Sequence, residues 1–147
     1  MKRTNAVGDL ACSVQRDDSG ERITGNAATF ANLEQLTDLR LDYTGLIGVL
    51  ATGPRVRIIR TIGSQHDSFK AGSNALTLER VAMLDGRMTG PVPSNLLNAP
   101  VLVQLSLRGN QFSTMPQQWA APALKFLDVS DNAIEVLLHA SCTPSVH

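Results

Sequence analysis

Aromatic residues are scarce in this chain of 147 residues, at 4%, so aliphatic side chains must fill most of its core. It has only two cysteines, Cys12 and Cys142, which lie at opposite ends and do not settle the redox compartment. The 13 basic and 13 acidic residues cancel, which suggests neither a nucleic-acid nor an anionic-membrane partner. No apolar run approaches the length of a membrane span. What the chain does have is leucine at regular spacing.

A pattern of five positions, apolar except for the fourth, occurs four times. Its copies are Leu36, Leu39, Leu41, Thr44 and Leu46; Leu78, Val81, Met83, Gly86 and Met88; Leu102, Leu105, Leu107, Asn110 and Phe112; and Leu124, Leu127, Val129, Asn132 and Ile134. The last two copies are 22 residues apart at every position. Apolar residues at a fixed period of this length are typical of repeat proteins, in which stacked coils bury a shared core.

The pattern resembles the leucine-rich repeat, LxxLxLxxNxL, over residues 23–138. The run from Met88 to Pro93 is similar to the plant-type continuation LxGxIP, and the run from Phe112 to Pro116 is similar to the typical form LxxLP. The resemblance implies an α/β-type solenoid, a right-handed coil with a short parallel β-sheet on its concave face and little helix. It specifies an architecture, whereas function depends on variable positions of the shared scaffold.

Each copy is expected to contribute one short strand to the sheet. The expected strands are 39–41, 81–83, 105–107 and 127–129. Leu36 and Leu78, the first positions of two successive copies, are 42 residues apart, which is nearly two periods. Residues 51–77 between them contain no clear copy, so they form either a degenerate coil or an inserted loop. Val56, Ile59 and Thr61 favour the degenerate coil, which a polar loop from Gly63 to Asn74 would follow, because long structureless loops are uncommon in compact domains.

The expected organisation has three parts. Residues 1–22 form a loose N-terminal segment or a degenerate cap, residues 23–138 form a repeat domain of about five coils, and residues 139–147 form a polar tail. The strand residues facing the core should be almost fully buried, namely Leu105, Leu107, Leu127 and Val129. Asn110 and Asn132 should satisfy backbone groups where the chain turns after each strand.

The sequence carries no recognisable catalytic motif. It lacks the phosphate-binding loop GxxxxGK[ST], the metalloprotease motif HExxH, the nucleophile motif GxSxG and a paired CxxC. His66, Asp67 and Ser68 are the three residue types of a hydrolase triad, but adjacent residues cannot form one, so a polar surface loop is expected there. Asp128 and Asp131 lack a third ligand for a cation. We therefore expect no enzyme activity, no metal and no cofactor.

The remaining candidate site is the outward face of the sheet, on the concave side. The residues that should line it are Arg40, Asp42, Tyr43, Arg80, Asp85, Arg108, Phe126, Asp128 and Asp131, with Arg60 if the degenerate coil holds. A generic solvated surface and a binding face are equally compatible with these positions. Two features favour binding, because arginine dominates the first half and aspartate the end, and because interfaces favour exposed aromatic residues.

The sequence therefore predicts a protein- or peptide-binding repeat module, which the resemblance makes receptor-like or inhibitor-like. The alternative is a structural subunit, or a fragment of a larger repeat protein such as a receptor-kinase ectodomain, stable only in an assembly. Its C-terminal edge, without a recognisable cap, should associate with a partner or with another copy. A conventional signal peptide is not recognisable at the start, which predicts a cytoplasmic protein, or an extracellular one if the chain is part of a receptor.

Overall fold

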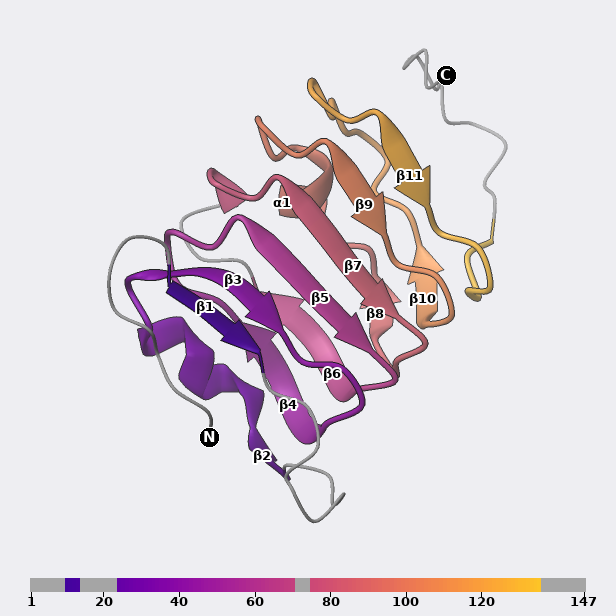
Figure 1. The fold of residues 1–147 in the computed structure, drawn as a ribbon. Coiled ribbons are helices and arrows are strands. Elements are labelled where there is room, and N and C mark those ends of the chain that lie inside the picture. The colour runs from indigo at the N-terminus through magenta and orange to yellow at the C-terminus, as the bar shows by residue number, and fades with distance from the viewer. Residues whose placement is uncertain (1–9, 14–23, 71–74, 136–147) are drawn as a thin grey trace.

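The computed structural model describes residues 10–13, 24–70 and 75–135, and it consists mostly of parallel strands in sheets with little helix. The main sheet has six strands, which lie side by side in chain order (Figure 1). They are β1 (Leu10–Ser13), β3 (Leu36–Arg40), β5 (Ile58–Ile62), β7 (Arg80–Leu84), β9 (Gln104–Ser106) and β11 (Phe126–Asp128). All neighbouring pairs are parallel.

Equivalent positions of successive repeats pair with one another across the main sheet. Leu39 pairs in register with Ile59, Ile59 with Val81, Val81 with Leu105, and Leu105 with Leu127. Ile59 supplies this position in the segment 51–77, where no clear copy of the pattern is present. Strand β5 lies between β3 and β7, so this segment contributes to the main sheet as the four clear copies do.

A second layer of strands lies behind the main sheet (Figure 1). One rear sheet contains β2 (Thr24–Asn26), β4 (Gly45–Ala51) and β6 (Gln65–Lys70), and the other contains β8 (Thr89–Pro91) and β10 (Gln111–Thr114). The expected polar loop over residues 63–74 is therefore wrong for β6. His66 and Phe69 of this strand are buried. The cause is that β6 pairs with β4, which draws these side chains into the interior.

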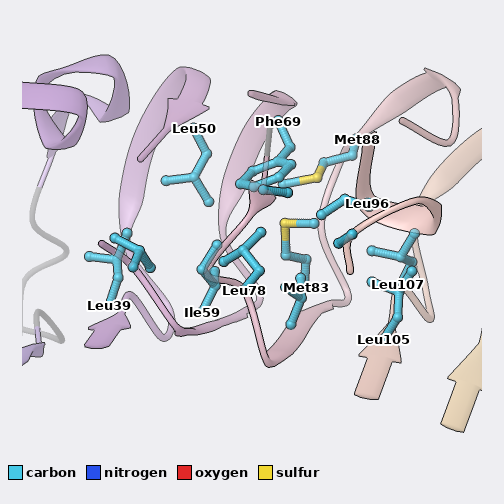
Figure 2. Packing of buried hydrophobic residues seen from close by; sticks show 14 of the residues in the cluster. Leu39, Leu50, Ile59, Phe69, Leu78, Met83, Met88, Leu96, Leu105 and Leu107 are labelled. Atoms are coloured by element: carbon cyan, nitrogen blue, oxygen red, sulfur yellow. The ribbon is translucent and has the colours of Figure 1, made fainter. Parts of the chain in front are cut away.

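The core fills the space between the two layers. Leu39, Ile59, Met83 and Leu105 point into it from the main sheet, and Leu50 reaches it from the rear layer (Figure 2). Strand alternation places one side chain inward and the next outward, so each repeat adds a similar set of inward residues. Burying one large aliphatic side chain of this kind contributes roughly 1.5–3 kcal/mol.

Two short helical segments complete the rear. The 3₁₀ helix η1 (Ala27–Asn32) begins after Asn26, whose side-chain oxygen accepts a hydrogen bond from the Ala28 backbone N–H at 2.9 Å. Helix α1 (Ser94–Leu97) buries its last two leucines in the core. In the part of the chain that the structure describes, no helix is long and apolar enough to cross a membrane.

Asn110 fixes the turn after β9, as its position in the pattern predicts. Its side-chain Nδ2 donates hydrogen bonds to the carbonyl oxygens of Met83, at 2.7 Å, and Leu107, at 2.9 Å. Its Oδ1 accepts a hydrogen bond from the Met88 backbone N–H at 3.2 Å. One buried amide therefore satisfies backbone groups from two successive repeats.

A side chain at the position of Asn110 also bonds to backbone groups one repeat later and, in a reduced form, in the segment 51–77. Asn132 donates to the carbonyl oxygens of Leu107 and Val129 and accepts from a backbone N–H of β10. In segment 51–77 the equivalent residue is Ser64, whose hydroxyl donates to the Leu41 carbonyl oxygen at 2.5 Å. A hydroxyl reaches one of the carbonyls but cannot also donate to a second one.

The two ends of the main sheet compare differently with the sequence-based expectation. Of the N-terminal segment, for which a loose segment and a degenerate cap were both expected, the structure describes β1, which pairs with β3. The rest of residues 1–22 and the polar tail 139–147 lie outside the described residues. At the other end, Leu127 and Val129 are only partly buried, whereas Leu105 and Leu107 are fully buried. The prediction of near-complete burial is wrong for Leu127 and Val129. In the described part, β11 has a strand neighbour on one side only.

Candidate functional site

The outward side of the main sheet, called here the front face, faces the viewer in Figure 1. Strand register arranges its side chains in rows that cross the strands. The first row is Asp38, Ile58, Arg80, Gln104 and Phe126, and the second row is Arg40, Arg60, Ala82, Ser106 and Asp128. Neighbouring members of a row are on adjacent strands, with backbones roughly 4.8 Å apart.

Arginines gather on the first half of the front face. Arg40 and Arg60 are register partners in the second row, and both are exposed. Arg80 follows on β7, in the first row, and is also exposed. The sequence analysis placed Arg60 on this face only if residues 51–77 form a coil. Because β5 pairs with β3 in the main sheet, Arg60 does join the cluster.

Asp42 was expected on the exposed face but is buried, with 6% of its surface accessible. Its Oδ2 lies 3.4 Å from Nε of Arg60, and its Oδ1 has no hydrogen-bond partner among the described residues. This carboxylate therefore acts as an internal counter-charge for Arg60 rather than as a group presented to a ligand. Ser106, another outward position, is also nearly buried.

Tyr43 is exposed at 51% and stands at the carboxyl end of β3. Its backbone is left-handed, with φ of 56°, which is uncommon for a bulky residue. The same turn position is left-handed after each of the strands β3, β5, β7, β9 and β11, where the residues are Tyr43, Gly63, Asp85, Gly109 and Asp131. The Tyr43 ring lies against Gly63, because a Cβ at that glycine would be 2.8 Å from Cδ1 of the ring.

The second half of the front face and its rim carry mainly acidic groups. Nε of Arg108 donates a hydrogen bond to Oδ2 of Asp131 at 2.9 Å. This bond is the main reason that the pKa of Arg108 is raised, and the carboxylates of Asp128 and Asp85 add to it. The Ser130 hydroxyl and backbone N–H donate to Asp128 and lower the pKa of its carboxyl group.

Phe126 ends the first row and is 48% exposed. Asp85 is exposed, and its carboxylate lies so close to Gly109 that a side chain there would collide with it. Beside the arginines, on β5 and β7, lie three half-buried apolar side chains that the sequence did not predict, namely Ile58, Ile62 and Leu84. One sign of these apolar side chains was present in the sequence, because Ile58 and Ile62 are apolar residues that do not fit the repeat pattern.

The predicted site residues thus lie together on one face or on its rim, apart from the buried Asp42 carboxylate. The described residues include no group of three or more histidine, cysteine, aspartate or glutamate side chains that could hold a metal ion. Comparisons with protein-family models, with curated proteins and with solved structures found no match to this chain.

Proposed function

We propose that the protein is a leucine-rich-repeat solenoid that binds an extended protein or peptide segment on its front face, without catalysis of its own. The observation that carries this proposal is the charge polarity of that face. Arg40, Arg60 and Arg80 lie on β3, β5 and β7, whereas Asp128 and Asp131 lie on and just after β11, where Asp131 accepts a hydrogen bond from Arg108. The acidic part of a ligand would lie over the arginines and its basic part over the aspartates.

Exposed aromatic side chains support the same proposal. Tyr43 lies at the rim, with its ring against Gly63, and Phe126 lies near the acidic end. Aromatic and arginine side chains concentrate binding energy, because they combine large contact area with hydrogen bonding or stacking. The half-buried Ile58, Ile62 and Leu84 would add apolar contact area beside the arginines.

The test is selection of binding peptides from a displayed random library on the intact chain, followed by titration of the selected peptides. Phe126→Ala and Arg80→Ala should each weaken binding by at least about fivefold, the effect of losing an interface residue worth roughly 1 kcal/mol or more. Gln118→Ala, at an exposed position away from the front face, is the control. If Gln118→Ala weakens binding and the two front-face changes do not, the assigned face is wrong.

A second candidate function is that of a structural part of a larger repeat assembly. The observation that favours it is the one-sided pairing of β11 in the described residues, with Leu127 and Val129 only partly buried. An open strand edge beside apolar side chains favours association. Sedimentation velocity at increasing concentration tests this, and a single monomer species at high concentration would contradict it.

A further inference from the structure

We infer that Arg40, Arg60 and Arg80, called here the arginine site, bind a phosphoryl dianion carried by a phosphorylated side chain of a peptide ligand. This inference rests on the proposed peptide-binding function, and it adds the chemical class of the group that is bound. Strand register brings the three residues together from repeats that are distant in sequence.

The first step is the proximity of like charges. Arg40 and Arg60 are direct neighbours on parallel strands, both on the front face, with backbones roughly 4.8 Å apart. Arg80 lies on the next strand and is offset by one row, because its register partner on β5 is Ile58. Like charges placed opposite each other across a sheet are destabilising, so an anion that bridges them relieves the repulsion.

The second step is the incomplete neutralisation of these charges. Asp42 makes an ion pair with Arg60, and its burial makes it a fixed counter-charge for that residue. Two other carboxylates are near. Asp38 is half-buried and makes no ion pair with the arginine site. Glu79, which also feels the charge of Arg80, is hydrogen-bonded to Arg57. Among the described residues, Arg40 and Arg80 have no ion-pair partner, so two guanidinium groups are available to a ligand.

The third step matches the ligand to these two groups. A guanidinium group offers paired N–H donors that fit either a carboxylate or a phosphoryl group. A carboxylate has two oxygens and one charge, which one arginine can satisfy. A phosphoryl group has three acceptor oxygens and a charge of about −1.5 to −2 at pH 7, which suits two arginines on either side. Ala82, beside Arg60 in the second row, is small enough to leave the approach open.

The arginine site is confined to one half of the face, which makes the assignment specific. Arg108, further along, is already hydrogen-bonded to Asp131 and lies close to Asp85 and Asp128. An added dianion there would meet three carboxylates. Arg87, just after β7, is exposed but belongs to neither row, so it provides a matched control of equal charge.

The experiment titrates the intact chain with three dye-labelled versions of one extended peptide, carrying phosphoserine, glutamate or serine at the centre. We expect the phosphoserine peptide to bind at least about tenfold more tightly than the glutamate peptide. Arg40→Gln and Arg80→Gln should each weaken phosphoserine-peptide binding about tenfold, whereas Arg87→Gln should leave it unchanged. Thermal unfolding of each variant without ligand verifies that it is folded.

The outcomes separate this inference from the proposed function. Equal affinity for the phosphoserine and glutamate peptides, with binding still reduced by Phe126→Ala, would overturn the phosphoryl assignment and leave the peptide-binding function intact. Inorganic phosphate that competes as well as the phosphoserine peptide would overturn the peptide as the source of the anion. Phosphoserine-peptide binding that responds to Arg40→Gln but not to Phe126→Ala would support the arginine site and contradict the wider binding face.

Discussion

The side-chain oxygen of Asn110 occupies the space that a side chain at Gly86 would need. A Cβ on Gly86 would lie 2.7 Å from Oδ1 of Asn110, which is closer than such atoms approach in folded proteins. Gly86 holds the same repeat position as Asn110, one copy earlier. The missing side chain in one repeat therefore makes room for the buried amide of the next.

Gly86→Ala should destabilise the protein by about 1–3 kcal/mol, because the added methyl group must displace an amide held by four hydrogen bonds. Urea unfolding measures this change. In an Asn110→Ala background the same substitution should cost less, since the oxygen that it meets is absent. Fully additive effects of the two substitutions would show that the Cβ does not meet the Asn110 oxygen.

His66→Leu should stabilise the protein. The histidine ring is buried, and neither ring nitrogen has a hydrogen-bond partner among the described residues. The equivalent positions of the four clear copies are apolar, namely Leu46, Met88, Phe112 and Ile134. Replacing an unsatisfied buried polar group with a leucine should raise the free energy of unfolding by about 1–3 kcal/mol. Thermal unfolding at pH 7.5 measures it, and a lower melting temperature would mean that the ring has an unrecognised partner.

His66 should also make stability depend on pH. Burial lowers its pKa from 6.5 to about 4, against a smaller opposing effect of Asp67. The unfolded chain therefore takes up the proton first as pH falls. Stability should be constant above about pH 6.5 and should decrease by about 3 kcal/mol as the pH falls from 6.5 to 4.

Urea unfolding of the wild type and of His66→Leu between pH 7.5 and 4 isolates this effect. The pKa values of Glu79 and Asp128 are also lowered, by hydrogen bonds from Arg57 and Ser130 respectively, and both proteins share their contribution. The stability difference between the two proteins should grow as the pH falls. A difference that does not change with pH would contradict the low pKa of His66.

Leu105→Ala should cost more than Leu127→Ala, although both residues hold the same repeat position. Leu105 is fully buried between two strands of the sheet, so its truncation should cost about 2–5 kcal/mol through lost burial and the cavity left behind. Leu127 is partly buried, so its truncation should cost less. Equal losses in urea unfolding would show that Leu127 is covered as completely as Leu105.

Much of the fold could be predicted from the sequence alone. Apolar residues at constant offsets, such as Leu39, Val81 and Leu105, predict strands at these positions, and the alternation within each strand predicts which side chains point inward. Asn110 and Asn132 were recognisable because a polar residue recurs at one position among buried leucines. These features depend on residues close together in the chain, so spacing is sufficient to detect them.

The candidate site was only partly predictable, because its chemistry depends on contacts between repeats. The sequence predicted that Arg40, Tyr43 and Phe126 would be exposed, but the burial of Asp42 and its ion pair with Arg60 follow from the register of β3 against β5. The burial of His66 likewise follows from the pairing of β6 with β4. The sequence determined what each repeat contains, and the tertiary structure decided which side chains meet, because partners some 20 residues apart are aligned only when the strands pair.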